Sequence, residues 1–280
     1  GYRLQFKQTG TGTASSSTIG ADTSGNGNHW TSSGIVASDC NMPDSPENNF
    51  CTINPLDKST DFTLSDGNLK VASGGSNTGN SRSTFSVSSG KWYWEARVNT
   101  TGTAHTIGIT TQSASLSTYL GNHANDYSYA RDGTKWSNNS SSSYGSSYAN
   151  GDNIGIALDL DSGTITFYKN GSSQGTAFSS LSGEFFPAFG DIAGADDINW
   201  IANFGQDSTF LGAISAGGNA DANGIGDFAY APPSGYLALC TSNLPEPTIG
   251  TNSVTQAVNH FGILTYTGDG QSSQNIVSGA

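Results

Sequence analysis

Leu158-Asp-Leu-Asp-Ser-Gly-Thr-Ile-Thr-Phe-Tyr-Lys-Asn-Gly171 is the stretch from which the architecture of this chain is inferred most directly. Apolar residues stand at every second position in residues 154–160 and again in residues 164–168, which is the period of a β-strand. Between the two runs lies the short loop Asp161-Ser162-Gly163, and Gly supplies the positive φ that hairpin turns need. Asn170-Gly171 repeats this turn signal. We therefore predict an antiparallel meander in which a tight turn follows each of two strands.

The composition of the 280-residue chain favours many short strands over helices. Charged residues make up 11% and hydrophobic residues 34%, and Ser, Thr, Asn and 37 glycines fill most of the rest. This mixture is too aromatic for a disordered chain and too rich in Gly for helices. The length allows one large β domain or two smaller ones, each with a proper core.

The charge and hydropathy patterns exclude two classes of partner. The formal net charge is −12, and the ten Lys and Arg residues are scattered along the chain. Proteins that track phosphates need clustered cations, so we expect no nucleic-acid partner. No run of about 18 apolar residues occurs, so we expect no membrane partner. The start at Gly1-Tyr2-Arg3-Leu4 argues against an intact signal peptide and suggests a fragment or a processed product.

We predict three parts along the chain. Residues 1–57 are interpreted as an N-terminal β arm or the edge of a preceding domain, and the alternating run Tyr2–Phe6 as its one strand. Residues 58–242 are predicted to form a β-sandwich. Residues 243–280 are interpreted as a linker and the start of a further β element, with a strand at residues 260–266. A lone strand pair has no core of its own, so we expect it to dock on the main domain, pair with another subunit or begin a further domain.

The central part contains several strand-like runs besides the meander. Lys91–Val98 places Trp92 and Trp94 on one face and Tyr93 and Glu95 on the other, which predicts a half-buried antiparallel strand. Shorter strands are predicted at residues 68–72, 82–87, 106–110, 184–190, 199–205 and 236–240.

Three cysteines, Cys40, Cys51 and Cys240, form an odd set without the spacing of a metal site. An oxidising setting would allow a bridge between Cys40 and Cys51. The alternative for Cys51 and Cys240 is a buried free thiol, because both stand in apolar surroundings.

We expect no catalytic site and no cofactor. Asp159 and Asp161 lie two apart on a strand and share a face, so they would suit glycosidic acid and base chemistry if held at the right separation. The simpler interpretation is structural, because Asp161 begins the hairpin turn. The four histidines lack zinc-binding spacing, and no Gly-x-Ser-x-Gly elbow is present.

Oxygen-rich turns offer weak calcium candidates, because a hard cation prefers oxygen ligands. One group is Asp22 with Asn26, and the other is Asp191, Asp196 and Asp197. The alternative for both is an ordinary capped turn.

The strongest candidate for a binding surface lies between residues 116 and 150. Tyr offers a rigid ring with a polar tip, and Ser, Asn and Gly offer adaptable hydrogen bonding. The Ser-rich run at residues 138–143 is expected to be an exposed loop. The alternative is that Tyr127 and Tyr129 face the core and that Trp136 covers the sheet. The candidate contact residues are Tyr119, Tyr127, Tyr129, Arg131, Asp132, Trp136, Tyr144 and Tyr148.

Five motifs resemble, in the same order, the core motifs of the SPRY (B30.2-like) domain. Together they span roughly residues 60 to 240, and five ordered motifs are far more specific than any single one. The resemblance implies a bent antiparallel β-sandwich, a concanavalin-like jelly roll, that serves binding and not catalysis. The motifs are Ser89–Glu95, Gly151–Leu160, Gly163–Gly171, Phe185–Phe189 and Asn203–Gly205.

The flanks resemble something narrower. Asp22–Trp30, Asp44–Leu56 and Phe261–Gln274 are similar to segments that border SPRY-like domains in tail-fibre and other structural proteins of marine bacteriophages. The resemblance implies a non-enzymatic virion protein, a tail fibre or capsid appendage, whose sandwich is a scaffold or binds a host-surface glycan or protein. Its partners would be other virion proteins or copies of itself. A secreted or cell-surface bacterial adhesin or lectin-like module is the alternative, and a glycan-degrading domain is a third.

Overall fold

The computed structural model describes residues 1–6, 8, 10–35, 44, 48–74, 78–100, 102, 104–192 and 198–245. The chain divides into two compact units, Gly1–Asn243 and Leu244–Ala280. Within the described residues there are fifteen β-strands and no helix. The predicted strand at residues 260–266 lies outside the described residues.

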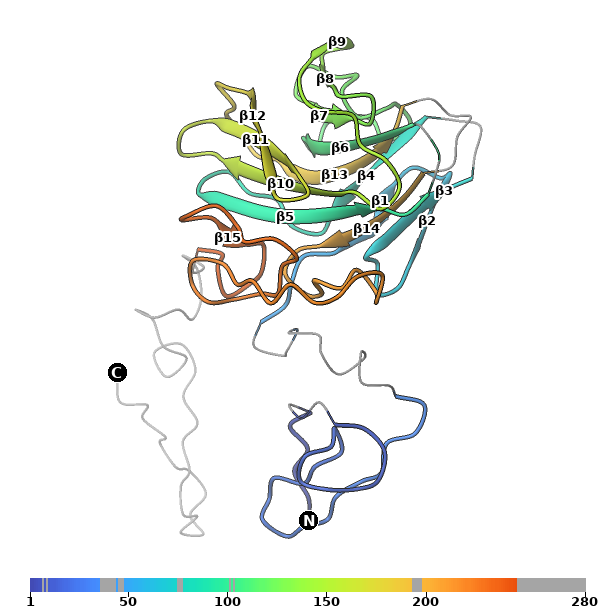
Figure 1. The fold of residues 1–280 in the computed structure, drawn as a ribbon, viewed down its shortest axis with the longest axis vertical. Helices are drawn as coiled ribbons and strands as arrows, with labels where there is room; N and C mark the ends of the chain where they lie inside the picture. The colour runs from blue at the N-terminus through green and yellow to red at the C-terminus, as the bar shows by residue number, and fades with distance from the viewer. Residues whose placement is uncertain are drawn as a thin grey trace, which may run out of the picture. The chain divides into compact units, whose positions relative to one another are not determined.

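Two sheets build the sandwich of the first unit (Figure 1). All pairings are antiparallel except that β15 (Leu237–Ala238) runs parallel to β5, so the predicted all-β antiparallel sandwich is confirmed. The seven-stranded sheet contains, in spatial order, β1 (Ile53–Lys58), β4 (Gly79–Ser83), β13 (Phe186–Asp191), β6 (His105–Thr110), β7 (Tyr127–Ala130), β8 (Thr134–Ser137) and β9 (Ser140–Ser143). The eight-stranded sheet contains β12 (Ser172–Phe178), β11 (Thr164–Lys169), β10 (Asn153–Asp159), β5 (Lys91–Val98), β14 (Ile198–Asn203), β3 (Lys70–Ser73) and β2 (Phe62–Ser65), with β15 added beside β5.

The predicted meander is confirmed as β10, β11 and β12. The pairing of β10 with β11 runs from Ile154 opposite Lys169 to Asp159 opposite Thr164. The turn between β11 and β12 holds Asn170 at φ 47° and Gly171 at φ 77°. Two consecutive residues at positive φ form the tight turn whose twist matches that of the flanking strands. The local turn chemistry therefore explains how the chain reverses here.

Aromatic side chains between the sheets form the core. Trp200 of β14 and Phe189 of β13 lie with ring centroids 6.3 Å apart, and Tyr129 of β7 lies 5.3 Å from Phe167 of β11. All four side chains are fully buried. Because each pair joins one sheet to the other, burial of these large rings is the main apolar contribution that holds the sandwich together.

The strand β5 is buried on both faces, which corrects the half-buried prediction. Tyr93 is 1% exposed and Glu95 is 0% exposed. A second hydrophobic cluster covers the Tyr93 side, and it includes Phe50, Phe228 and Cys240. The chain after β14 folds back over this face, so residues that alternation assigns to solvent become interior.

The sandwich begins before the predicted boundary at residue 58. Phe50 forms a bridge with Cys240, and the Cys51 amide donates to the Leu239 carbonyl at 2.9 Å. Residues 53–58 then pair with β4 as strand β1. The end of the segment that was assigned to an arm therefore supplies an edge strand and the buried side chains of Phe50, Cys51 and Ile53.

Other strand boundaries differ less. The runs predicted at residues 68–72, 106–110, 184–190, 199–205 and 236–240 correspond to β3, β6, β13, β14 and β15. The run predicted at residues 82–87 ends early, because after Ser83 only Val87 makes an isolated bridge, with Phe185. Residues 2–6 do not form a strand, since Leu4 makes only a single bridge with Asp22.

Asp22 organises the described part of the N-terminal arm. Its carboxylate accepts hydrogen bonds from the amides of Arg3 at 2.8 Å, Ser24 at 2.8 Å and Asn28 at 3.0 Å. The Arg3 amide contributes most to holding the pKa of Asp22 below its usual value. This arrangement is that of a capped turn.

Cys51 and Cys240 are buried free thiols, and Cys40 lies outside the described residues. Burial raises the pKa of the Cys51 thiol to about 11. The thiolate is the reactive form of cysteine. Because Cys51 is buried and its thiol stays protonated, it is a poor nucleophile.

Candidate binding surface

The candidate surface is built on β7, β8 and β9, which extend one end of the seven-stranded sheet (Figure 1). Asn138 and Asn139 join β8 to β9 with φ of 52° and 55°. Asn tolerates this left-handed conformation better than other residues with a Cβ. The expected exposed loop at residues 138–143 is instead a two-residue turn followed by the four-residue strand β9, because the Asn pair aligns Ser140–Ser143 against β8.

Trp136 dominates one face of this hairpin. Its indole Nε1 donates to the Thr134 hydroxyl at 2.9 Å, and its ring meets the Tyr119 ring edge-on with centroids 5.6 Å apart. The Tyr119 hydroxyl donates to the Asn139 side chain. Trp136, Tyr119 and Thr134 are half-buried, and Asn139, Ser141 and Ser143 are exposed. We call this surface the Trp136 face, and it consists of Tyr119, Thr134, Trp136, Asn139, Ser141 and Ser143.

The opposite face of the hairpin packs on the eight-stranded sheet. Lys135 donates its ammonium to the Ala177 carbonyl at 2.5 Å, and the same group lies 5.1 Å from the centre of the Phe178 ring. The Tyr144 hydroxyl donates to the Gly175 carbonyl at 2.5 Å. The Tyr127 ring lies 5.0 Å from that of Phe178. Tyr127 and Tyr144 therefore join the two sheets and contribute little to the outer face.

Tyr129 and Tyr148 lie in the core, at 0% and 2% exposure. The Tyr129 hydroxyl donates to the Ser146 carbonyl, and the Tyr148 hydroxyl lies 3.1 Å from the His105 carbonyl. Burial raises the pKa of both phenols well above their usual value. The prediction that these two residues touch a ligand is corrected: their rings support the surface from beneath, as the core-facing alternative holds for Tyr129.

Arg131 and Asp132 shape the turn between β7 and β8. The Arg131 Nε donates to the Tyr148 carbonyl at 3.0 Å. Asp132 accepts hydrogen bonds from the Thr134 amide at 2.9 Å and the Thr134 hydroxyl at 2.6 Å. Asp132 is exposed, so its carboxylate also borders the Trp136 face.

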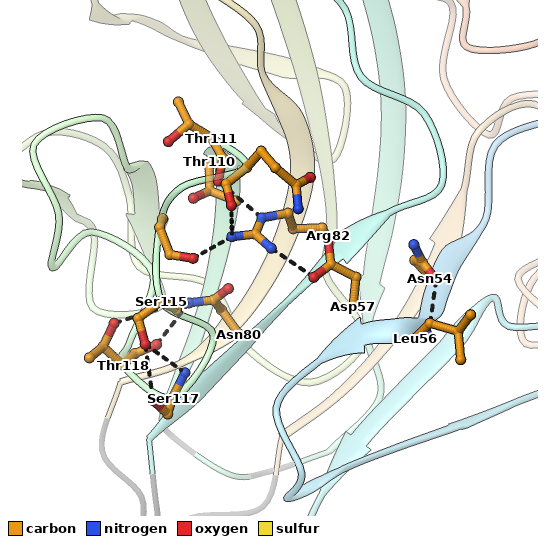
Figure 2. Close-up of polar contacts among 12 residues, drawn as sticks. Asn54, Leu56, Asp57, Asn80, Arg82, Thr110, Thr111, Ser115, Ser117 and Thr118 are labelled. Atoms are coloured by element: carbon orange, nitrogen blue, oxygen red, sulfur yellow. Dashed lines mark hydrogen bonds and ion pairs between the residues drawn. The ribbon is translucent and has the colours of Figure 1, made fainter.

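A buried arginine fixes the loop that leads to Tyr119. Arg82 is 2% exposed and pairs with Asp57 at 2.8 Å. Its remaining donors reach the carbonyls of Thr111 and Gln112 at 3.0 Å each, and also that of Ala114 (Figure 2). A planar guanidinium with five donors can hold several carbonyls at once, which lysine cannot do.

Asn80 continues this support. Its side-chain amide donates to the carbonyls of Ser115 at 3.0 Å and Thr118 at 2.8 Å (Figure 2). Sequence reasoning missed both Asn80 and Arg82. The available signal was a lone Arg in a run of small polar residues, which does not reveal that the side chain points inward.

Asp126 and His123 tie the hairpin tip to this loop. Asp126 accepts from the Thr110 hydroxyl at 2.6 Å and from the His123 amide at 3.1 Å. The amides of Asn138 and Asn139 donate to the carbonyls of His123 at 3.0 Å and Gly121 at 2.9 Å. The Trp136 face is therefore held in one conformation by its own scaffold.

The carboxylate pair Asp159 and Asp161 is structural. Asp159 accepts from the amides of Asp161 and Ser162 at 3.0 Å each and pairs with Lys91 at 3.1 Å. Asp161 accepts from the Gly90 amide at 2.9 Å. Burial pushes the pKa of Asp159 upward, but bonds from Ser162 and Lys91 outweigh it and leave the pKa below its usual value. A carboxyl that stays ionised cannot serve as the general acid of a glycosidase.

Asp191, the first of the second set of calcium candidates, is fully buried and accepts from the Ser73 hydroxyl at 2.9 Å. Asp196 and Asp197 lie outside the described residues. Across the described part of the chain, no three His, Cys, Asp or Glu side chains come together as a metal site. The same part contains no helix long and apolar enough to cross a bilayer.

Glu95 is a second functional-looking group that the sequence did not reveal. It is 0% exposed and accepts from the amides of Ala229 and Tyr230 at 2.9 Å each. The hydroxyl of Tyr93 donates to it at 3.1 Å. Burial raises the pKa of Glu95 to about 7, although these hydrogen bonds act in the other direction. Because Glu95 has no access to solvent, it anchors the chain that covers β5 and does not contact a ligand.

Comparisons with known proteins find similarity to the SPRY domain. Residues 91–196 match the family model described as the SPRY domain. An ATP-dependent RNA helicase DDX1 from Xenopus laevis is 29% identical over 67% of this chain and 22% of its own length. Ran-binding protein 9 from Xenopus tropicalis is 32% identical over 54% of this chain and 29% of its own length. The chain thus spans less than a third of the length of either relative.

The SPRY domain of human HERC1 is a solved structure with 18% identity, a TM-score of 0.49, and coverage of 54% of this chain and 96% of its own. The family match includes the β5 motif Lys91–Val98 and the whole meander β10 to β12. Four of the five motifs on which the resemblance rested lie in or overlap the matched residues, and Asn203–Gly205 lies beyond them. Residues 91–196 of this chain are thus similar to the SPRY domain.

Proposed function

We propose that this protein is a non-enzymatic virion structural protein, a phage tail-fibre or capsid-appendage segment. Its SPRY sandwich would act as a scaffold that presents the Trp136 face to a glycan or protein on the host surface. The observation that carries the recognition part is the Trp136 face itself: two half-buried rings, Tyr119 and Trp136, stand among exposed hydroxyl and amide groups.

The chemistry of this face suits recognition. A fixed aromatic ring can stack on the apolar face of a sugar or on a side chain, and surrounding hydroxyls and amides supply directional hydrogen bonds. Preorganisation supports the proposal as well, because Arg82 and Asn80 hold the loop before Tyr119. A surface that is already ordered loses less entropy on binding. A relative whose printed name is a binding protein, Ran-binding protein 9, is consistent with a protein ligand.

The non-enzymatic part of the proposal is supported by the structural contacts of the carboxylates that could have been catalytic. Asp159 and Asp161 are engaged in turn and strand contacts. Glu95, whose pKa is raised to about 7, is enclosed by the chain that it anchors. A perturbed carboxyl is a catalytic candidate only where substrate can reach it.

Glycan-array and host-cell adsorption measurements on the full chain test the recognition part. Trp136→Ala is expected to reduce binding at least about tenfold, since loss of one aromatic anchor costs about 1–3 kcal/mol or more at a binding surface. Trp30→Ala is the control, because it removes the same type of side chain from the arm, where Trp30 is 53% exposed, and leaves the Trp136 face unchanged. Equal binding by wild type and Trp136→Ala would contradict the proposal for this face.

The virion part is tested separately. Sequencing the complete reading frame with its neighbouring genes is expected to place it among capsid and tail genes. Mass spectrometry of purified particles is expected to detect the protein. A reading frame with a cell-wall or membrane anchor, and particles without the protein, would favour an adhesin instead.

A further inference from the structure

We propose that the free edge of β9 accepts an extended segment of a partner protein as an additional β-strand. This inference rests on the recognition part of the proposed function, and it names the partner: a neutral or basic peptide in extended conformation. The strand would continue the seven-stranded sheet beyond Ser140–Ser143.

The first step is the direction of the main-chain groups of β9. Ser137 and Ser140 flank the two-residue turn and face each other, and so do Lys135 and Ser142. In a hairpin with a two-residue turn the closing pair is hydrogen-bonded, and bonded and non-bonded pairs then alternate. The bond from the Tyr144 amide to the Gly133 carbonyl, at 3.1 Å, agrees with this phase. The amides and carbonyls of Ser141 and Ser143 therefore point away from β8, toward the open edge.

The second step is that the described sheets protect their other edges. β12 carries Gly175 at φ 83° in an irregular register. Two of its carbonyls, those of Gly175 and Ala177, accept hydrogen bonds from the side chains of Tyr144 and Lys135. Bulges and charged side chains are ways in which proteins prevent an edge from pairing with another chain.

The edges β1 and β2 are protected in the same manner. β1 contains Pro55, which has no amide to donate, and a register irregularity between Ile53 and Lys58. At β2 the Lys58 ammonium donates to the Phe62 carbonyl at 2.6 Å. β9 differs from β12 and β1 because Ser140–Ser143 has no bulge and no Pro. It differs from β2 because every one of its residues is exposed, whereas Phe62 of β2 is buried.

The third step is that β9 is held ready for pairing. One end is anchored where the Asn139 amide donates to the Gly121 carbonyl at 2.9 Å, and the other where the Gly145 amide donates to the Gly133 carbonyl at 2.9 Å. Four residues at about 3.4 Å each give a template roughly 14 Å long. The serine side chains are too small to obstruct a neighbouring strand.

The size and charge of the edge indicate the occupant. A second copy of the chain pairing through β9 would contribute four residues per side, whereas stable protein interfaces use roughly 20–30 residues per side. A short extended peptide needs no larger area, since main-chain bonds supply affinity and alternate side chains supply specificity. The net charge of −12 and the exposed Asp132 disfavour an acidic peptide. Alternate side chains of the added strand would lie over the Trp136 face, beside Ser141 and Ser143.

The test uses short linear peptides selected from a random display library on the full chain, then synthesised. Ser141→Pro removes the outward amide while leaving the bonds of β9 to β8 intact, and Pro is tolerated at such an edge position. It is expected to weaken peptide binding about tenfold or more, the effect of losing at least one main-chain hydrogen bond. Ser141→Thr keeps the outward amide and is the matched comparison, so it is expected to bind the peptide more tightly than Ser141→Pro. Ser143→Pro provides a second variant with the same expectation, and thermal unfolding checks that all three fold.

Hydrogen exchange locates the contact. Bound peptide is expected to slow exchange at Ser141 and Ser143, with little change at Ser140 and Ser142, whose amides already bond to β8. Peptides that bind Ser141→Pro as tightly as wild type would overturn strand addition but leave recognition elsewhere intact. A library that yields no peptide, with glycan binding still lost in Trp136→Ala, would likewise overturn strand addition alone. If every variant binds both glycan and peptide as tightly as wild type, both proposals are contradicted.

Discussion

The meander and the β8–β9 hairpin use the same local device in opposite surroundings. Each has a two-residue turn with both residues at positive φ, Asn170-Gly171 in the meander and Asn138-Asn139 in the hairpin. The first brings together strands whose side chains fill the core, including Phe167 at 0% exposure. The second presents Ser140–Ser143 to solvent. Turn chemistry therefore specifies where the chain reverses, and packing partners specify whether the reversal supports the fold or offers a surface.

The largest expected difference between the two regions is in stability. Phe167→Ala is expected to lower the free energy of unfolding by about 3–5 kcal/mol, because it leaves a cavity beneath the rings of Tyr129 and Tyr144. Urea denaturation measures the change. Phe167→Leu keeps much of the apolar volume and should lose clearly less. A loss under about 1 kcal/mol in Phe167→Ala would mean that the meander is not the stabilising element we describe.

A second expected difference is pH dependence, and it belongs to the covered face of β5. The pKa of Glu95 is about 7 in the folded chain and near 4.5 when unfolded, so the folded state holds the proton more tightly. The corresponding stability is fully present below about pH 4.5 and is lost as the pH rises through about 7, a total of roughly 3 kcal/mol.

Denaturation at a series of pH values in this range measures the effect, and Glu95→Gln is expected to flatten it. The amide of Glu95→Gln keeps one acceptor oxygen but cannot ionise. The variant should therefore lose no stability through residue 95 as the pH rises over this range. A wild-type slope equal to that of the variant would show that Glu95 does not titrate there.

The smallest expected effect concerns the turn of the hairpin. Asn139→Ala replaces a residue that tolerates the left-handed conformation at φ 55° by one that does not, which costs about 1 kcal/mol, and Asn139→Gly is the matched variant that should restore the turn. Asn170→Ala should cost more, because Asn170 also bonds the Asn153 amide at 2.9 Å and Asp152 at 2.7 Å. Hydrogen exchange at Ser140 and unfolding free energies distinguish the two turns. Equal costs would remove the distinction between them.

Several features could be predicted because they depend on neighbours in the sequence. Strand period located β5, β10 and β11, and the pair Asn170-Gly171 located the turn to β12. The Tyr-rich region was predicted to form a loop surface; within it Trp136 and Tyr119 are half-buried and contact each other, and their contact with a ligand stays a prediction. The ordered motifs also predicted the similarity to the SPRY domain, whose family model matches residues 91–196.

Other features could not be predicted because burial depends on residues distant in the sequence. Tyr129 and Trp136 belong to the same class of residue in the same region, yet one is 0% exposed and the other half-buried. The difference arises because Phe167, from the other sheet, packs on Tyr129. Composition alone assigns both to a recognition loop.

Local hydrogen bonding and side-chain alternation, both readable from consecutive residues, were enough to establish an all-β chain, its central strands and its tight turns. Tertiary packing alone decided which faces are covered and which edges stay open. Glu95 is interior because amides 134 and 135 positions later fold over it. The edge of β9 is open because no described segment returns to it. Strand period specifies two faces for every strand, but only the rest of the folded chain determines what each face meets.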